Sequence, residues 1–219
     1  MKTVYFVRHG ESEANAKEDI YHGEETPLTD KGREQAQFIA KRCAKLNVDV
    51  LIASTAVRAQ QTASYIVELT DLDMETNRLF TERKPPRELM GRSREEPDAK
   101  AMYHEWTLSF FQENVRVASG ENFTDLKARV LQGLEHLLKR PEKRILVVSH
   151  GFFLHMVAAL VLLGEDLTAA EYNRFAPAIW VDNTGLTRIE HREQVFPRID
   201  GKHHKGWVLR VWNDHAHLG

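Results

Sequence analysis

The sequence predicts an α/β fold: a three-layer α/β/α sandwich with a mainly parallel sheet and an inserted lid. Apolar β-rich runs alternate with segments of helical periodicity, which is typical of parallel sheets covered by helices on both faces. Two of these runs, Thr3–Val7 and 144–149, each end directly in a His-Gly pair or one residue before it. Residues 83–118 break the rhythm with prolines and dense charge, which indicates an insertion.

Length and composition indicate one folded domain over residues 1–219, with the lid inserted at about 83–118. The chain has 219 residues, of which 42% are apolar and 28% charged, as in ordinary globular domains. The net charge of -2 provides no general electrostatic basis for binding nucleic acid or an acidic membrane. Affinity for an anion must therefore come from local clusters of basic residues.

The single cysteine, Cys43, excludes an internal disulfide and fits a reducing compartment, so we expect a cytoplasmic protein. Cys43 lies on the apolar stripe of a predicted helix, which favours a buried thiol over a nucleophile. The N-terminus shows no signal-peptide pattern. The longest apolar stretch, Phe152–Leu163, is too short to cross a bilayer and predicts a buried helix.

The first half of the chain predicts a strand, a loop and a helix in turn. After the strand at Thr3–Val7, residues 10–28 are polar and predict an active-site loop. Thr29 is the expected N-cap of the next helix. The apolar face of this helix is expected to contain Ala36, Ile39, Ala40, Cys43 and Leu46.

A second strand is expected at Val48–Ala53, followed by a helix from about Val57 to Leu69. Arg58 falls in the first turn of that helix, where a cation opposes the helix dipole. Its position therefore suggests a nearby anion. A third strand is expected at Met74–Phe80, with a polar exit at residues 81–83.

In the second half, a helix is expected to open at Ser119 and to end at Pro141, before the strand at 144–149. Strand-like runs at 178–182, 185–190 and 207–212 predict edge strands or a hairpin. The tail tryptophans Trp207 and Trp212 fit either a core or an interface, so a homodimer is one option.

Several chemically active side chains follow the ends of predicted strands. Because the carboxyl ends of parallel strands meet at one edge of a sheet, we expect these side chains to form one pocket. Guanidinium groups and glycine amides suit a phosphoryl group, and an imidazole and a carboxyl group suit nucleophilic attack and proton transfer. Each alone also fits a structural role. The residues are Arg8, His9, Ser54, Arg58, Glu82 and His150, with Gly10 and Gly151 beside the histidines.

Five motifs in order, spanning most of the chain, resemble the histidine phosphatase superfamily, in the branch that contains cofactor-dependent phosphoglycerate mutases. The first motif is fairly specific, and the ordered set is highly specific. The motifs are Arg8-His9-Gly10-Glu11-Ser12 with Asn15 behind it, Pro27-Leu28-Thr29-Asp30-Lys31-Gly32, Ser54 through Arg58-Ala59-Gln60-Gln61-Thr62-Ala63, Ser149-His150-Gly151, and Asp182-Asn183-Thr184.

The resemblance implies a role for each matching residue. His9 would be the nucleophile that forms a phosphohistidine, and Glu82 the general acid and base. It also implies a small phosphorylated substrate and neither a metal nor a cofactor. The phosphoryl group would be bound by Arg8, Asn15, Arg58, His150 and Gly151.

Two further residues of the first motif have alternative interpretations. Glu11 would orient the ring or an arginine. Ser12 would either donate to phosphate or cap the next turn.

Departures from the family pattern favour a phosphatase over a mutase. The mutases carry Tyr-Gly shortly after the acid, whereas this chain has Pro85 and Pro86, and no second arginine pair is evident. With one anion clamp lost, water takes the phosphoryl group more easily. The alternatives are a cofactor-dependent phosphoglycerate mutase and, from another class, a non-catalytic module that binds a phosphorylated ligand.

The basic residues of the lid fit two interpretations equally well. They either grip the anionic remainder of a substrate or form a solvated face balanced by acidic neighbours. The basic residues are Arg83, Lys84, Arg87, Arg92 and Arg94, and the acidic ones are Glu88, Glu95, Glu96 and Asp98.

The tail contains four histidines that suggest a metal site, but nothing in the pattern makes them converge, so surface or hydrogen-bonding roles are favoured. They are His203, His204, His215 and His217. Asn213-Asp214 with His217-Leu218 resembles the ending of some family phosphatases, which implies a supporting role near the site.

Overall fold

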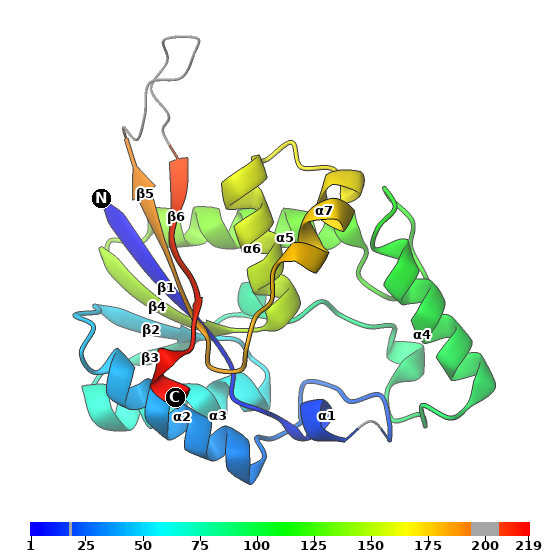
Figure 1. Cartoon of the computed structure of the whole chain (residues 1–219), viewed down its shortest axis with the longest axis horizontal. Helices are drawn as coiled ribbons and strands as arrows, with labels where there is room; N and C mark the ends of the chain where they lie inside the picture. Colours follow the sequence, from blue (N-terminus) through cyan, green and yellow to red (C-terminus); the bar gives the residue numbers. More distant parts are fainter. Residues whose placement is uncertain (18, 194–205) are drawn as a thin grey trace.

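The computed structural model describes residues 1–17, 19–193 and 206–219 and contains one six-stranded sheet. The strand order is β3-β2-β4-β1-β5-β6 (Figure 1). The strands are β1 Lys2–Arg8, β2 Val50–Ala53, β3 Met74–Thr76, β4 Arg144–Ser149, β5 Leu186–Arg192 and β6 Gly206–Asp214.

Four strands, β1 to β4, pair in parallel, whereas β5 and β6 pair antiparallel at one edge of the sheet. The predicted mainly parallel α/β fold is therefore confirmed. The tail runs expected at 185–190 and 207–212 form β5 and β6, the hairpin-like edge. In the described part of β6, Trp207 and Trp212 are half-buried and pack against the main core.

Helices cover both faces of the sheet, which gives the predicted three layers. On one face, α2 (Asp30–Cys43) and α3 (Val57–Thr70) pack on Val7, Leu51 and Val148. On the other, α5 (Phe123–Lys139) and α6 (Gly151–Leu163) pack on Phe6, Ile52 and Val147. Neighbouring residues of one strand serve opposite layers because side chains alternate along a strand. Figure 1 shows this arrangement.

The remaining elements lie around the sheet. The helix α4 (Pro97–Ser109), in the segment expected to be inserted, stands apart from the sheet in Figure 1. It shares a small separate core with the loop that follows β1, formed by Tyr21, Leu89 and Ala99. The elements are α1 Glu13–Ala16, α4 Pro97–Ser109, α7 Ala169–Phe175, and the 3-10 turns η1 Arg78–Phe80, η2 Arg87–Leu89, η3 Ala176–Ala178 and η4 Ala216–Leu218.

Two predicted strands were wrong in part or whole. β3 ends at Thr76, because the Asn77 side chain accepts a hydrogen bond from the Leu79 amide at 3.0 Å and starts the turn η1. The run at 178–182 forms no strand. Proline at position 177 places a 3-10 turn just before it, and the Val181 carbonyl accepts a hydrogen bond from the Arg8 guanidinium instead of a strand partner.

The helix expected to open at Ser119 begins four residues later. Asn122 caps it, accepting from the Asp125 amide at 2.9 Å, while the Asp125 carboxylate accepts from the Asn122 amide at 3.1 Å. This reciprocal capping satisfies amides that the helix cannot pair internally. Residues 119–121 are thereby free for the contacts described below.

Cys43 is fully buried in α2, as predicted, and burial raises the pKa of its thiol to about 12. Among the described residues, no helix combines the length and apolarity needed to cross a membrane.

Candidate active site

The pairing of β1 with β4 brings His9 and His150 together. Arg8 lies opposite Ser149 in the parallel register, so the two His-Gly sequences leave the sheet side by side. The His9 amide donates to the Ser149 carbonyl at 3.0 Å, and the two ring centroids lie 5.0 Å apart. Both side chains are almost fully buried. The two histidines therefore lie side by side where β1 and β4 end.

Hydrogen bonds fix the tautomer of His9. Its Nδ1 lies 2.7 Å from the Gly10 carbonyl oxygen, which can only accept, so Nδ1 carries the proton. Nε2 therefore presents a lone pair, and Arg58 Nε donates to it at 3.2 Å. Burial, followed by the charges of Arg58 and Arg8, lowers the pKa of His9 well below its ordinary value. The imidazole is thus neutral at neutral pH, as a nucleophile requires.

Arg58 bridges the two imidazoles from the first turn of α3. Its Nη2 donates to His150 Nδ1 at 3.3 Å and its Nη1 to the Gly23 carbonyl at 3.2 Å. The opposite nitrogen of His150 lies 2.7 Å from Ser54 Oγ, to which it donates. Burial and the Arg58 charge lower the pKa of His150 well below its ordinary value. The cation in the first turn of α3, Arg58, therefore contacts both histidines of the site.

Arg8 points into the same site with one nitrogen unused. Its Nη1 donates to the Val181 carbonyl, whereas its buried Nε has no hydrogen-bond partner among the described residues. Burial lowers the pKa of this guanidinium, opposed by the nearby carboxylates of Glu82 and Asp182. A buried N–H donor without a partner suits an oxyanion ligand.

Two glycines explain why the loop after β1 sits so close to α2. A Cβ on Gly10 would lie 2.5 Å from the Gly32 carbonyl oxygen, and a Cβ on Gly32 would lie 1.9 Å from the Glu11 oxygen. The Gly10 amide donates to Thr62 Oγ1 of α3 at 3.0 Å. These contacts hold the loop that carries His9, so the glycines of the first two motifs serve close packing.

The other residues of the first motif have local roles in this structure. Glu11 accepts from Thr29 Oγ1 at 3.0 Å and from Lys31 Nζ at 2.7 Å, so the expectation that it orients the ring or an arginine was wrong. Ser12 is the N-cap residue of α1, and its Oγ donates to Asn15 Oδ1 at 3.1 Å, which favours the capping alternative. Asn15 Oδ1 also accepts from Asn183 Nδ2 at 3.4 Å.

The carboxylate of Glu82 lies at the N-terminus of α6. The Phe152 amide donates to its Oε1 at 3.1 Å, and the Arg83 amide donates to the same oxygen at 2.9 Å. A Cβ on Gly151 would lie 3.7 Å from Arg8 Nε and 3.8 Å from Glu82 Oε2. The helix terminus, the acid and the guanidinium therefore surround one small volume beside the two histidines.

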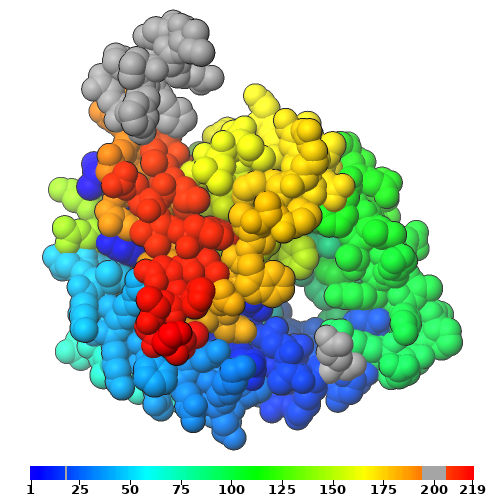
Figure 2. All heavy atoms as spheres, viewed as in Figure 1, coloured from blue at the N-terminus to red at the C-terminus, as the bar shows by residue number. Residues whose placement is uncertain are grey.

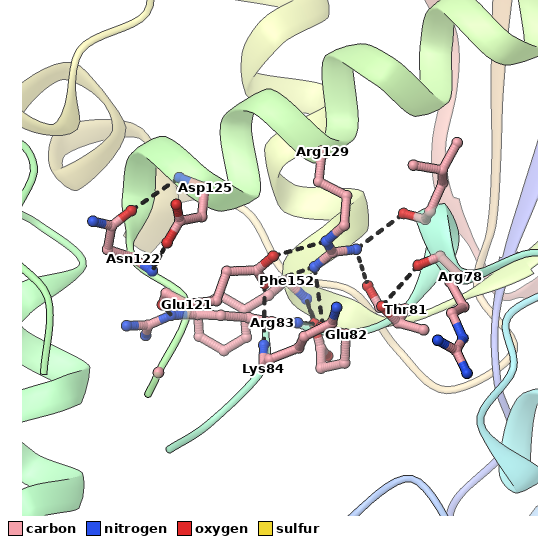
Figure 3. Close-up of polar contacts among 12 residues, drawn as sticks. Arg78, Thr81, Glu82, Arg83, Lys84, Glu121, Asn122, Asp125, Arg129 and Phe152 are labelled. Atoms are coloured by element: carbon pink, nitrogen blue, oxygen red, sulfur yellow. Dashed lines mark hydrogen bonds and ion pairs between the residues drawn. The ribbon is translucent and has the colours of Figure 1, made fainter. Parts of the chain in front are cut away.

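A buried ion pair holds the segment that carries Glu82. Arg129 of α5 donates to Glu121 through two nitrogens, at 2.8 and 2.7 Å. The same guanidinium donates to the carbonyls of Leu79, Thr81 and Glu82 at 2.9, 2.7 and 3.1 Å. Figure 3 shows this guanidinium at the centre of the network. Arg129 could not be predicted from the sequence, because nothing in its local pattern distinguishes it from a solvated helix cation.

Of the basic residues in the segment 83–118, Arg92 fits the solvated face, whereas Arg83 fits neither interpretation. Arg92 pairs with Glu96 and Asp98, as expected for a solvated face. Arg83 is buried, with its Cζ 3.7 Å from the Trp106 ring centroid and 4.1 Å from that of Phe110. Burial lowers the pKa of Arg83 to about 9. Its other partners are the carbonyls of Glu121 and Trp106, so it joins segments of the chain rather than forming an exposed basic face.

The C-terminal segment supports the loop at 182–184, which in turn contacts His9. Asn213 Oδ1 accepts from the Asp182 amide at 2.8 Å, and His217 Nε2 lies 3.0 Å from Thr184 Oγ1. Asn183 Nδ2 donates to the His9 carbonyl at 3.0 Å.

The four tail histidines do not all fall within the described structure. His203 and His204 lie outside the described residues, and His215 lies 3.5 Å from the Asp182 carboxylate. Within the described ranges, no three histidine, cysteine or carboxylate side chains are grouped as a metal site would need.

Comparisons with known proteins agree on one family. A family model described as "Histidine phosphatase superfamily (branch 1)" matches residues 4–201. A relative from Enterobacter sp. (strain 638), named "Probable phosphoglycerate mutase GpmB", is 32% identical over 222 residues, covering 100% of this chain and 95% of the relative.

Two solved structures illustrate the structural likeness. The alpha-ribazole phosphatase from Shigella flexneri has a TM-score of 0.75 at 25% identity, covering 97% of this chain and 96% of that one. A mutant phosphoserine phosphatase from Entamoeba histolytica in complex with phosphoserine has a TM-score of 0.74 at 24% identity, covering 100% of both chains.

Proposed function

Since the chain belongs to branch 1 of the histidine phosphatase superfamily, we propose that it hydrolyses phosphomonoesters through a phosphohistidine on His9. One observation carries the proposal: His9 is buried and neutral, its Nε2 lone pair accepts from Arg58 Nε, and the charges of Arg58 and Arg8 both act on its ring. A nucleophile held beside cations attacks a phosphorus atom whose negative oxygens those cations bind.

In the first step, His9 Nε2 forms a bond to phosphorus and the bond to the ester oxygen breaks. Glu82, in its protonated form, donates its proton to the departing oxygen. In the second step, Glu82 takes a proton from water, which attacks phosphorus and displaces His9 as inorganic phosphate forms. One residue thus serves as acid and then as base, because the second step reverses the chemistry of the first.

Five residues hold the phosphoryl group in this proposal. Positive charge and donors around the transferring group stabilise the charge on its oxygens. Arg8 supplies its unpartnered Nε, and Gly151 permits close approach to the amides of the α6 N-terminus. The full set is Arg8, Asn15, Arg58, His150 and Gly151, with the resemblance providing the basis for Asn15.

A phosphoglycerate mutase is the second candidate, because relatives about 30% identical along the whole chain bear that name. The residues after Glu82 support hydrolysis instead. Pro85 and Pro86 occupy the sequence positions at which the mutases carry Tyr-Gly. The cavity beside Glu82 has a volume of about 1090 Å³. A mutase must keep its phosphoenzyme from water, which an open cavity of this size does not favour.

The test is rapid-quench mass spectrometry with p-nitrophenyl phosphate in EDTA. We expect a phosphate adduct on His9 and release of inorganic phosphate, both abolished in His9→Ala and retained in His104→Ala, an exposed histidine of α4. Absence of both signals would contradict the phosphatase and leave the non-catalytic phospho-ligand module. Faster phosphoryl transfer to phosphoglycerate than to water, with 2,3-bisphosphoglycerate as primer, would identify a mutase.

A further inference from the structure

A large cavity extends from the reacting residues toward the lid. Its lining includes Arg58, Thr81 and Glu82, and also Met90, Tyr103 and Thr107 of the segment 83–118. Figure 2 shows a hollow between the N-terminal loop (blue) and the α4 region (green).

The size of the cavity limits what the substrate can be. Its volume of about 1090 Å³ is at or above the range of roughly 300–1,000 Å³ for sites that bury drug-sized ligands. The phosphoryl group and a three-carbon acid would leave most of this space to water. A leaving group that uses the cavity must therefore be considerably larger.

Three cations that line the cavity, Arg78, Lys84 and Arg87, carry no side-chain ion pair among the described residues. This distinguishes them from Arg92, which is neutralised by two carboxylates outside the cavity lining. The Glu24 carboxylate, which also lines the cavity, accepts from Thr55 Oγ1 at 3.2 Å. The wall formed by residues 78–87 therefore has an excess of positive charge.

The backbones of two of these cations are fixed. The Lys84 amide donates to Glu121 Oε2 at 3.1 Å, and its carbonyl accepts from the Glu121 amide at 2.8 Å. The Arg87 amide donates to Ser119 Oγ at 2.8 Å. Pro85 and Pro86 lie between them and restrict the chain further. Charges presented from a fixed backbone lose less entropy on binding an anion.

An apolar surface adjoins the reacting end. Phe152, whose amide binds Glu82, lines the cavity with 42% of its surface exposed, an unusual exposure for a phenylalanine. Tyr103 and Met90 line the space beyond it. These surfaces suit the body of a leaving group whose ester oxygen lies at Glu82.

We propose that the leaving group of the substrate is bulky and carries a second anionic group, bound by Lys84 and Arg87. This inference rests on the proposed phosphatase function. The second anion is a phosphate or a carboxylate, since both accept from lysine and arginine in the same way. Because this second anion takes no part in breaking the ester bond, it contributes equally to ground-state and transition-state binding and lowers KM rather than raising kcat.

The test compares matched ligands as competitive inhibitors of p-nitrophenyl phosphate turnover. One pair is AMP and adenosine 3′,5′-bisphosphate, which differ by a second phosphate. The other is glucose 6-phosphate and 6-phosphogluconate, which differ by a carboxylate. We expect the doubly anionic member of at least one pair to bind more tightly, with a Ki lower by about tenfold or more. One or two charge-assisted contacts allow a difference of this size.

The Lys84→Gln, Arg87→Gln double variant should reduce this preference to about twofold or less, since only screened, long-range attraction remains. Lys100→Gln, an exposed lysine of α4 outside the cavity lining, should keep it. Equal Ki values within both pairs, or a preference that survives the double variant, would overturn the inference alone. No turnover of p-nitrophenyl phosphate and no adduct on His9 would overturn the phosphatase function, and this inference with it.

Discussion

At the scale of single residues, the site is organised by which nitrogen of each histidine carries a proton. The Gly10 carbonyl and Ser54 Oγ accept from His9 and His150, so both rings direct an unprotonated nitrogen at Arg58. Burial, and then the guanidinium between the two imidazoles, disfavours the charged form of both rings. This arrangement predicts the protonation behaviour of His9.

We expect NMR titration to place the pKa of His9 well below 6.5, because burial and then Arg58 and Arg8 disfavour its charged form. Arg58→Gln removes one cation and should raise this pKa toward its ordinary value. His155, whose pKa is lowered to about 4 by burial and then Arg8, is the internal control and should not respond. A wild-type value near 6.5, or no response to the substitution, would contradict this account.

At the scale of elements, Gly32 shows that packing between a loop and a helix can override helix propensity. Alanine is favoured over glycine inside a helix by about 1 kcal/mol. A Cβ at Gly32 would nevertheless lie 1.9 Å from the Glu11 carbonyl oxygen, a backbone atom that cannot rotate away.

Gly32→Ala is therefore expected to destabilise the protein by about 2 kcal/mol or more, since overpacking costs roughly 1–3 kcal/mol and the loop must also shift. Urea unfolding measures the change. Gly133→Ala in α5 is the comparison, because its Cβ would meet the edge of the Phe80 ring at 3.3 Å, and a ring can move. A stabilised Gly32→Ala would show that propensity dominates.

The buried Arg129–Glu121 pair joins α5 to residues 79–82, so its removal should destabilise the protein. Arg129→Met leaves Glu121 buried without its partner and frees three carbonyls, so we expect a loss of about 3–5 kcal/mol in urea unfolding. Adding Glu121→Gln should recover part of this loss. Lys139→Met, which breaks an exposed pair with Glu135 on the same helix, should change little.

Two substrates with different leaving groups distinguish a purely structural role of Arg129 from a role in positioning Glu82. Displacing Glu82 should reduce kcat/KM about tenfold more for glycerol phosphate than for p-nitrophenyl phosphate, because p-nitrophenolate departs without a proton. Equal reductions for both substrates would mean that Arg129 stabilises the fold without positioning the acid.

At the scale of the whole molecule, the two buried histidines make the free energy of unfolding depend on pH. The pKa values of His9 and His150 lie well below that of the unfolded chain, so the unfolded state binds more protons in acid. Above about pH 6.5 both rings are neutral in the unfolded chain as well, so burying them neutral costs no deprotonation. As the pH falls below that value, each ring lowers the free energy of unfolding by about 1.4 kcal/mol per pH unit until its folded pKa is reached.

We therefore expect urea unfolding between pH 7 and pH 5 to show stability falling toward acid, with a smaller slope in His150→Asn. Asparagine occupies the site without taking up a proton on unfolding. A slope that is unchanged in the variant would mean that His150 is protonated in the folded protein and that its environment has been misjudged.

The sequence by itself determined the layer architecture, the order of strands and helices, and the chemical groups at the strand ends. These features are local: the period of apolar residues, a capping residue or a His-Gly pair records them within a few positions. The wrong predictions at Met74–Phe80 and 178–182 were local as well. There, Asn77 and the Arg8–Val181 contact competed with apolar strand-like patterns.

Only the tertiary structure decided how those groups are used. The tautomers of His9 and His150, the Arg129–Glu121 pair, the burial of Arg83 and the charge on the cavity wall each depend on contacts between segments far apart in the chain. A local pattern cannot record such contacts, because the same arginine suits a solvated helix face and a buried clamp equally well. Folding selects between them by the cost of burying a charge without a partner.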